Sequence, residues 1–249
     1  MSKRARAGKR RGATSTWREL ALDRLTRPAA SSDEVFQRLA GLTKALGFEF
    51  CSFGVRAPAM DATPRELWST TYPAHWTTRY FGNNYLAIDP VVQHARRHTT
   101  PFVWSDVSFE DQRPFWEEAR ASGARYGWAL GMHGRHGETG LVSLARSAEP
   151  LSQAELADVD AKLVWLSCLS HEIINTLFVR EVLPPLPTLS ERERDVLRWT
   201  AMGKTCEEIG VILGIATRTV TFHVTSLLAK LDAVNKTHAV AKAAMLKLL

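Results

Sequence analysis

The stretch LSERERDVLRWTAMGKTCEEIGVILGIATRTVTFHVTSLLAKL, residues 189–231, decides the fold of the C-terminal part of this chain. Ser190 with Glu193, and later Thr205 with Glu208, have the Ser/Thr-x-x-Glu spacing of a capping box. In that motif each side chain bonds the backbone N–H of the other residue, so the pair marks the first turn of a helix. The stretch therefore predicts two short helices in close succession.

Glycines mark the ends of these two helices, since Gly203 follows the first and Gly214 the second. A glycine closes a helix readily because it adopts the left-handed backbone conformation without strain. A third helix is expected over Thr217–Leu231, and Asn235 can cap a fourth. The buried stripe expected on the third helix consists of Val220, Val224, Leu227, Leu228 and Leu231.

Short helices in succession over residues 188–249 indicate an all-α helix-turn-helix domain of four helices, with the motif at about Cys206 to Thr225. The outer face at the start of its recognition helix enters the major groove of DNA. Threonine hydroxyls bond base edges or phosphates, and threonine and phenylalanine carbons contact the thymine methyl group. The candidate DNA-contacting residues are Arg218, Thr221, Phe222, Thr225 and Lys230. A four-helix module that binds protein remains the alternative.

The formal net charge of +6 is unevenly distributed along the 249 residues. Residues 1–27 contain nine Lys and Arg against two Asp and Glu, and residues 188–249 contain nine against six. Residues 28–187 contain fourteen against eighteen. Both ends can therefore be attracted to a polyanion such as DNA, whereas the middle has no such bias. The N-terminal basic run is either a solubilising tail or an arm that steers the protein to DNA.

The sequence LPPLP at residues 183–187 contains three prolines, which exclude both a helix and a β-ladder. We interpret residues 182–187 as a short, stiff Pro-rich linker. The chain is then expected to comprise a basic arm with a short helix (1–30), a sensing domain (31–181), this linker, and the DNA-binding domain (188–249).

The overall composition limits the classes of protein to which this chain can belong. No stretch approaches the ~20 uninterrupted apolar residues of a membrane helix, and no apolar run follows the N-terminal basic residues as a secretory signal requires. Cys51, Cys168 and Cys206 are odd in number and far apart, so they indicate neither a disulfide framework nor a zinc site. We expect a soluble, cytoplasmic protein without a membrane partner, metal or cofactor.

The region before the linker mixes helical and strand periodicities. Helices are expected over residues 33–46, 74–82, 88–98, 111–122 and 153–181, and strands over 48–55, 67–72, 127–133 and 139–145. This order favours an α/β/α sandwich with a mostly antiparallel sheet, so the whole chain falls in the α+β class. The apolar stripe expected on the last helix, broad enough for a core and a partner subunit, consists of Leu156, Val159, Leu163, Leu166, Leu169, Ile173 and Leu177.

The segment 189–231 resembles the DNA-binding domain of LuxR-type quorum-sensing regulators, with Glu193, Leu197 and Gly203 at corresponding places before a GKT..EI helix. Several members of that family have basic residues where this chain has threonines in the recognition helix, so an operator sequence does not carry over. The same kind of output domain follows phosphate-switched receivers, but no acidic cluster with a nucleophilic Asp and a distal Lys is evident here.

The segment YPAHWTTRYFGNNYLAIDP, residues 72–90, is similar to the acyl-homoserine-lactone-binding domain of the same family, and this resemblance extends over residues 35–178. It implies that Trp76, Tyr80, Asp89 and Trp104 surround the lactone of the signal ligand. The segments FEFCSFGVRAP and EEIGVIL are most similar to orphan receptors of the family, which respond to a signal made by another synthase.

The chemistry of these residues suits such a ligand, which is neutral and has an amide N–H, carbonyl oxygens and an aliphatic tail. Ionised Asp89 can accept the amide proton, and the Trp76 indole can donate to the lactone carbonyl. Tyr72 and Ser143 can hold the acyl carbonyl, while Tyr80 and Trp104 wall the site. Weaker candidates for the tail region are Ser52, Gly54, Arg56 and Trp68. Each has a plainer interpretation, since a Trp is often core and an Asp before a Pro often caps a helix.

We expect the ligand to complete the core of the sensing domain, after which a homodimer would form through residues 153–181 and bind DNA. Two other functions remain open. A lactone-degrading enzyme would need a metal-binding cluster, yet His94 and His98 form only an i, i+4 pair, and no G-x-S-x-G elbow is present. A regulator without a ligand, which acts by pairing with other family members, is the third hypothesis.

Overall fold

The computed structural model describes residues 16–57, 64–105, 113–134, 137–182 and 187–249. The expected basic arm, up to residue 15, and residues 183–186 of the expected linker lie outside these ranges.

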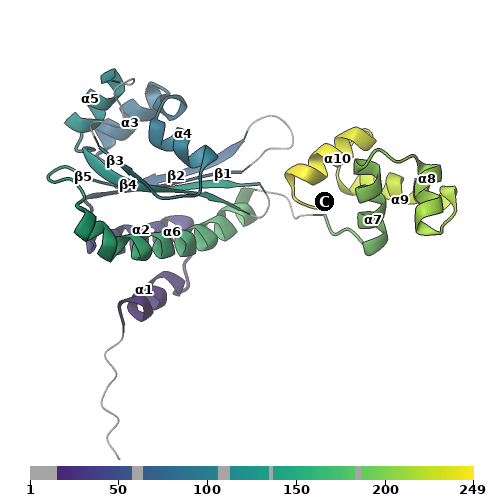
Figure 1. Ribbon diagram of the computed structural model, residues 1–249, viewed down its shortest axis with the longest axis horizontal. Helices are drawn as coiled ribbons and strands as arrows, with labels where there is room; N and C mark the ends of the chain where they lie inside the picture. The colour runs from purple at the N-terminus through teal and green to yellow at the C-terminus, as the bar shows by residue number, and fades with distance from the viewer. Residues whose placement is uncertain (1–15, 58–63, 106–112, 135–136, 183–186) are drawn as a thin grey trace, which may run out of the picture.

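The elements follow one another in chain order as Figure 1 shows. Their bounds are α1 (Trp17–Thr26), α2 (Ser32–Lys44), β1 (Phe50–Ala57), β2 (Arg65–Thr70), α3 (Ala74–Gly82), the 3-10 helix η1 (Tyr85–Ala87), α4 (Pro90–Arg97), β3 (Phe102–Trp104), α5 (Arg113–Ala121), β4 (Tyr126–His133), β5 (Thr139–Arg146), α6 (Gln153–Val182), α7 (Glu191–Ala201), α8 (Cys206–Leu213), α9 (Thr217–Lys230) and α10 (Lys236–Met245).

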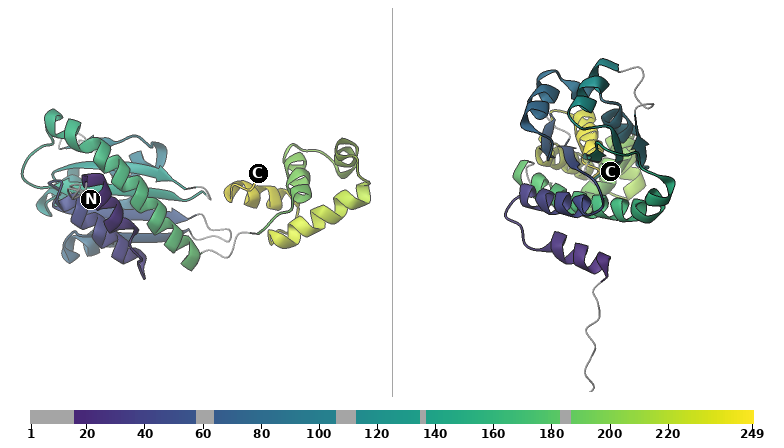
Figure 2. Two further views of the ribbon diagram at one scale, coloured as in Figure 1. Left: turned by 90° about the horizontal axis from the view of Figure 1, so that it is seen from below. Right: turned by 90° about the vertical axis from the view of Figure 1, so that its left-hand side faces the viewer.

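The N-terminal domain is built on a five-stranded sheet in the order β2-β1-β5-β4-β3, in which every neighbouring pair is antiparallel. Helices α2 and α6 cover one face, and α3, α4 and α5 lie over the other (Figure 1). Helices α2 and α6 run beside each other across their face of the sheet (Figure 2). The predicted sandwich with an antiparallel sheet is therefore confirmed.

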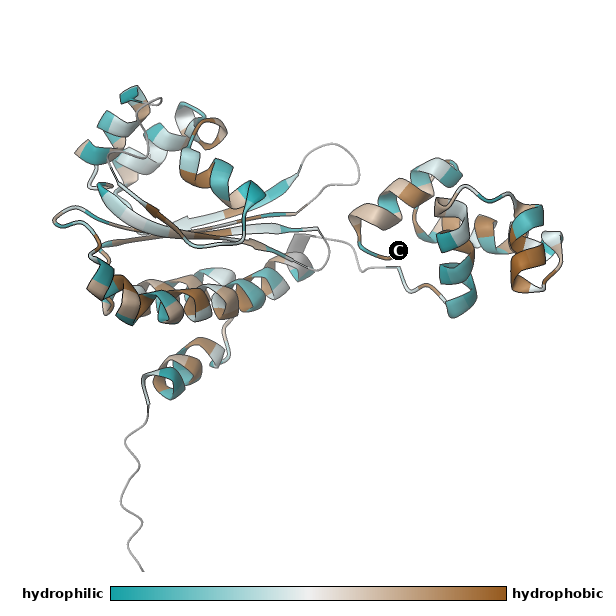
Figure 3. Cartoon of the chain, viewed as in Figure 1, coloured by the Kyte–Doolittle hydropathy of each residue, from teal (hydrophilic) through white to brown (hydrophobic). Residues whose placement is uncertain are grey.

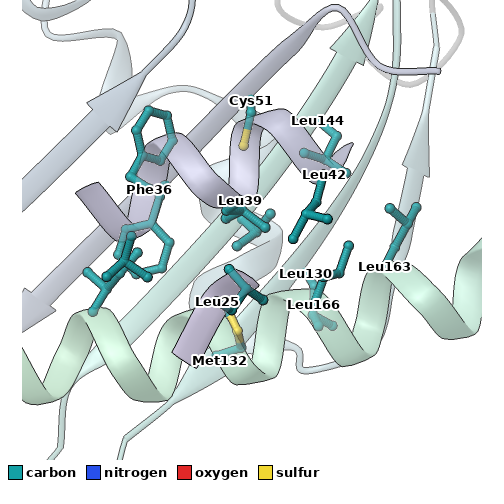
Figure 4. Packing of buried hydrophobic residues seen from close by; sticks show 14 of the residues in the cluster. Leu25, Phe36, Leu39, Leu42, Cys51, Leu130, Met132, Leu144, Leu163 and Leu166 are labelled. Carbon is teal, nitrogen blue, oxygen red and sulfur yellow. The ribbon is translucent and has the colours of Figure 1, made fainter. Parts of the chain in front are cut away.

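The face toward α2 and α6 is filled by large side chains. Strand β1 places Phe53 and Val55 on this side, where they join a core that includes Leu39 of α2 and Leu163 and Leu166 of α6. Figure 4 shows the leucines of α2, β4 and α6 pointing toward one another. Phe53, Val55, Leu39, Leu163 and Leu166 are at most 1% exposed, so they form a tightly packed core.

The opposite face of the same strands carries small residues, because side chains alternate between the two faces of a sheet. A Cβ atom on Gly127 would overlap the Trp104 ring, and one on Gly131 would overlap the backbone carbonyl oxygens of Ala95 in α4 and of His98, its C-cap. Glycine at these positions lets an aromatic ring and a helix approach the sheet closely. The other small residues of this face are Ser52, Gly54, Ala129, Ser143 and Ala145.

The structure adds two features of the N-terminal domain that the sequence analysis did not include. Strand β3 was not anticipated, because three residues are too few to show a period. The apolar stripe expected on α6 has a buried and a partly buried portion: Val159, Leu163 and Leu166 are buried, and Leu156, Leu169, Ile173 and Leu177 are partly buried. Ile174 and Phe178 also belong to the buried side. Polar residues share that buried side, so hydropathy alone did not mark its full extent; they are Ser167, Ser170, His171 and Asn175.

The helices of the C-terminal domain begin and end at the capping residues that the sequence indicates. Both capping boxes are formed, at Ser190–Glu193 and Thr205–Glu208. Gly214 ends α8 with a left-handed backbone, φ 65°, and Asn235 caps α10. The core joins α7, α8, α9 and α10 around the stripe predicted on α9, of which only Leu228 is partly rather than fully buried.

Part of α8 is hydrophobic, as its brown colour in Figure 3 shows, and some apolar side chains of this domain are exposed. Val211 is 84% exposed and Phe222 is 68% exposed. In the described parts of the chain, no individual helix has the length and apolar character to cross a membrane, and α8 with α9 meets that criterion only as a pair bent by 111°.

Candidate functional site

A cavity of about 130 Å³ lies between the small-residue face of the sheet and helices α3, α4 and α5. Eight of the ten residues predicted for a ligand line it: Ser52, Trp68, Tyr72, Trp76, Tyr80, Asp89, Trp104 and Ser143. They come from β1, β2, β3, β5 and α3 and from the segments next to them, so the fold gathers residues that are up to 91 positions apart in sequence.

Asp89 is the polar centre of the cavity wall. Its Oδ1 accepts the backbone N–H of Val91 at 2.8 Å, which makes it the N-cap of α4, and its Oδ2 accepts the Tyr80 hydroxyl at 2.6 Å. Burial raises the pKa of Asp89, although these hydrogen bonds oppose the shift. The helix cap anchors the carboxylate and leaves acceptor capacity on its oxygens for a further donor.

Aromatic rings enclose the space beside this carboxylate. Trp76 is 5% exposed, and its ring lies 5.8 Å from Tyr80 and 6.3 Å from Phe115. Trp104 meets Trp116 edge-on at 5.6 Å. Such a wall offers a large apolar area of fixed shape.

Hydroxyl groups lie on the sheet side of the cavity. Tyr72 stacks on Phe50, with ring centroids 4.4 Å apart. Burial, and then the charge of Asp89, raise the pKa of Tyr72 far above its ordinary value, so the hydroxyl stays protonated and can donate. Ser52 shares a hydrogen bond of 2.7 Å with Thr70, and Ser143 lies opposite Ser52 in the β1–β5 ladder.

Gly54 and Arg56 do not line this cavity, although they were predicted for the same region. They line a smaller hollow of about 30 Å³. The Arg56 Nε forms an ion pair of 3.2 Å with Glu66 on the neighbouring strand. Both lie on the same face of β1 as Ser52, because side chains alternate along a strand, but the Trp68 ring of the neighbouring strand covers Gly54.

Helix α5 supplies wall residues that sequence reasoning missed, namely Phe115, Trp116 and Ala119. Their signal was present in the helix expected over residues 111–122, whose aromatic pair had no assigned role. The helix is tied to α3 by Glu118, which accepts hydrogen bonds from Arg79 and, at 2.7 Å, from the Tyr85 hydroxyl. The Arg79 guanidinium and Tyr85 lower the pKa of Glu118 to about 2, so the tie is charged at neutral pH.

Helix α9 of the C-terminal domain presents the predicted DNA-contacting side chains. Arg218, Thr221, Phe222 and Thr225 are all exposed on it. The Thr221 and Thr225 hydroxyls donate to backbone carbonyls one turn earlier, at 3.0 and 3.1 Å. Their methyl groups and the Phe222 ring therefore offer an apolar surface beside the Arg218 guanidinium.

Lys230, the last of the candidate DNA-contacting residues, forms contacts within the domain. Its ammonium donates to Glu193 at 2.7 Å and to the Thr188 carbonyl at 3.1 Å, so it ties α9 to α7. Glu193 is 4% exposed and also accepts the Ser226 hydroxyl at 2.7 Å. Burial opposes ionisation of Glu193, but the hydrogen bonds from Lys230 and Ser226 outweigh it and lower its pKa to about 2. Lys230 thus holds the recognition helix in position.

A cavity with a fixed acceptor and aromatic walls in one domain, and an exposed recognition helix in the other, together define a DNA-binding regulator that responds to a small molecule. Residues 31–174 match the autoinducer binding domain, and residues 187–243 match the bacterial regulatory proteins of the luxR family. The chain belongs to the LuxR family of quorum-sensing transcriptional regulators.

Known relatives are similar over most of their length. The transcriptional activator protein SolR of Ralstonia solanacearum is 38% identical over 218 residues, which cover 87% of this chain and 92% of SolR. The crystal structure of Escherichia coli SdiA superimposes with a TM-score of 0.76 at 33% identity, covering 93% of this chain and 97% of SdiA. SdiA in complex with octanoyl-rac-glycerol gives a TM-score of 0.74 at 31% identity, over 92% and 93% of the two chains.

Proposed function

We propose that the cavity binds an N-acyl-homoserine lactone in a defined orientation. Asp89 accepts the amide N–H, the Trp76 indole donates to the lactone carbonyl, and the hydroxyls of Tyr72 and Ser143 hold the acyl carbonyl. Tyr80 and Trp104 pack against the lactone ring. The observation that carries this proposal is the capped Asp89 carboxylate at the wall of an otherwise aromatic cavity.

A neutral amide N–H is a suitable hydrogen-bond donor to this buried carboxylate. Burial disfavours the charge on Asp89, and a further hydrogen bond would offset part of that cost. The SdiA structure with octanoyl-rac-glycerol shows a relative with another neutral acyl compound. A glycerol headgroup offers hydroxyl donors to the same acceptor, so acylglycerols are the competing ligand class to include in a binding test.

The cavity also favours a binding role over catalysis. Both Asp89 oxygens already accept hydrogen bonds, from Tyr80 and from the first turn of α4. Such an anchored carboxylate suits an acceptor more than a base that has to activate water. We therefore propose a regulator that is not an enzyme, and that acts in the cytoplasm, where its DNA target lies.

We further propose that the protein acts on DNA as a homodimer. The outward side of α6 exposes Cys168 and leaves Trp165, Leu169 and Ile173 partly uncovered. Pairing of two such faces would place two α9 helices on one side of DNA, about one helical turn apart. The proposed domain bounds are 1–30 for the arm and short helix, 31–181 for the sensing domain, 182–187 for the linker and 188–249 for the DNA-binding domain.

The test is to purify the protein after growth with a panel of acyl-homoserine lactones and acylglycerols, and to identify the retained compound by mass spectrometry. We expect one intact lactone for each protein chain. Asp89→Asn should weaken its retention by about 10- to 100-fold, because a hydrogen bond to a charged group is lost. The matched control is Asp158→Asn, at an exposed carboxylate of α6.

Several outcomes would contradict the proposal. Retention of an acylglycerol alone would replace the ligand class, and recovery of ring-opened lactone would indicate an enzyme. Operator binding by protein that is soluble and folded without any retained compound would favour a regulator that needs no ligand.

A further inference from the structure

We propose that Trp68 is a partition that limits the acyl-chain length of the ligand, and that Gly54 is the positioning residue that allows this ring to lie there. The proposal rests on the proposed function, since it concerns the tail of the same ligand. It predicts that the wild-type protein prefers ligands with short acyl chains.

Two hollows meet at the Trp68 ring. The cavity of about 130 Å³ and the smaller hollow of about 30 Å³ share three wall residues, Trp68, Val92 and Leu141. Val92 belongs to α4 and Leu141 to β5, so both are held in packed elements. Trp68 is on β2, an edge strand, and is only partly buried. Of the three shared walls, Trp68 is therefore the one that can move at the smallest cost in packing.

Gly54 allows the ring to lie against the sheet. The two residues are direct partners in the β1–β2 ladder, and a Cβ atom on Gly54 would overlap three carbon atoms of the Trp68 ring. An aromatic ring that covers a cross-strand glycine gains contact with the backbone, which any larger residue would prevent.

Further contacts hold the ring at its edges. The Trp68 Nε1–H donates to Glu66 at 3.3 Å, and the other oxygen of Glu66 pairs with Arg56 at 3.2 Å. Phe81 of α3 meets the ring edge-on, with centroids 6.2 Å apart. Phe81 is itself 42% exposed, so this contact is at the rim of the domain. The Trp68 ring is thus held by contacts outside the core that faces α2 and α6.

The position of the ring determines where the acyl chain can extend. With the ring in place, the tail is confined to the larger cavity. With the ring displaced, the space joins the smaller hollow, whose walls include Ala95, Val92 and Leu141. Each additional methylene that then becomes buried should strengthen binding about fourfold, because burial of one CH₂ stabilises by about 0.8 kcal/mol.

The experiment compares the dissociation constants of butanoyl- and dodecanoyl-homoserine lactone for full-length wild type, Trp68→Ala and Gly54→Ala. Wild type should bind the butanoyl compound more tightly. Both variants should shift the ratio toward the dodecanoyl compound by at least tenfold. Gly54→Ala is the decisive variant, because a simple volume argument predicts the opposite shift when a methyl group is added. Val103→Ala, at a partly exposed position on the other edge strand, is the control and should leave the ratio unchanged.

Each result supports or overturns a specific claim. An unchanged ratio in both variants, or a shift toward butanoyl in Gly54→Ala, overturns the partition while the proposed function stands. Failure of wild type to bind either lactone overturns the proposed function instead. If either variant fails to fold, Trp68→Phe and Glu66→Ala provide the same test, because each removes the hydrogen bond from the Trp68 indole to Glu66. Both should shift the ratio toward dodecanoyl; an unchanged ratio in both would again overturn the partition.

Discussion

The two faces of the N-terminal sheet are built from the same strands but packed in opposite ways. Toward α2 and α6 the strands present Phe53, Trp128, Val142 and Leu144, all of which are completely buried. Toward α3, α4 and α5 the central strands present mainly glycine, serine and alanine, with Leu141 among them, and a cavity remains. Stability and ligand recognition are therefore separated by the alternation of residues along each strand.

The separation is most sharply tested by a matched pair of leucines. Leu166→Ala, on the filled face, should lower the free energy of unfolding by about 2–5 kcal/mol, because it leaves a void in a packed core. Leu141→Ala, on the cavity face, should cost clearly less, since its side chain already borders empty space. Urea denaturation of both variants measures the difference. Equal costs would show that both faces are filled to the same degree.

A saturating ligand should stabilise only the N-terminal domain. At a free lactone concentration 100 times the dissociation constant, the gain is about 2.7 kcal/mol. Two thermal transitions followed by calorimetry would test this, and only the transition of the sensing domain should move. A shift of both transitions by the same amount would mean that the domains unfold as a unit.

The close approach of α4 to the sheet can be broken with one methyl group. Gly131→Ala should destabilise the protein by about 1–3 kcal/mol and weaken lactone binding, because the new Cβ overlaps carbonyl oxygens at the C-terminal end of α4, the helix that Asp89 caps. Gly82→Ala is the control, since nothing lies within 4 Å of its added Cβ. Equal stability of both variants in denaturant titrations would exclude the tight α4–sheet contact.

The smallest expected effects are on pH dependence, and they have opposite signs at two carboxylates. Burial raises the pKa of Asp89, so its contribution to stability is present below the ordinary pKa of 3.8 and is lost as pH rises through the folded-state value. The stability of unliganded wild type relative to Asp89→Asn should therefore increase on acidification. The difference in unfolding free energy, measured between pH 7 and pH 4, tests this sign.

Glu193 supplies the opposite case. Its pKa is lowered to about 2 from 4.5, so the stabilisation is present above 4.5 and is lost as pH falls toward 2. The advantage of wild type over Glu193→Gln should shrink over that interval. An advantage that did not depend on pH would show that the Lys230 contact is not an ionic one.

Local signals in the sequence were sufficient for the helix boundaries of the DNA-binding domain. Capping boxes and a left-handed glycine act within one or two turns, so neighbouring residues alone determine where these helices begin and end. The same holds for Asp89 before Pro90, where the helix cap named as its plainer interpretation is present. By contrast, Lys230 could not be assigned from local sequence, because its partner Glu193 is 37 residues away.

The amino-acid sequence by itself determined the order of the elements apart from β3, the helix ends of the DNA-binding domain, and the chemistry that Asp89 and Trp76 offer. These follow from backbone periodicity and side-chain type, which are properties of neighbouring residues. Only the tertiary structure decided that Trp68 covers Gly54, that α5 closes the cavity with Phe115, and that Lys230 is held by Glu193. Such outcomes depend on which distant surfaces meet, and steric fit between them is not encoded in any single segment.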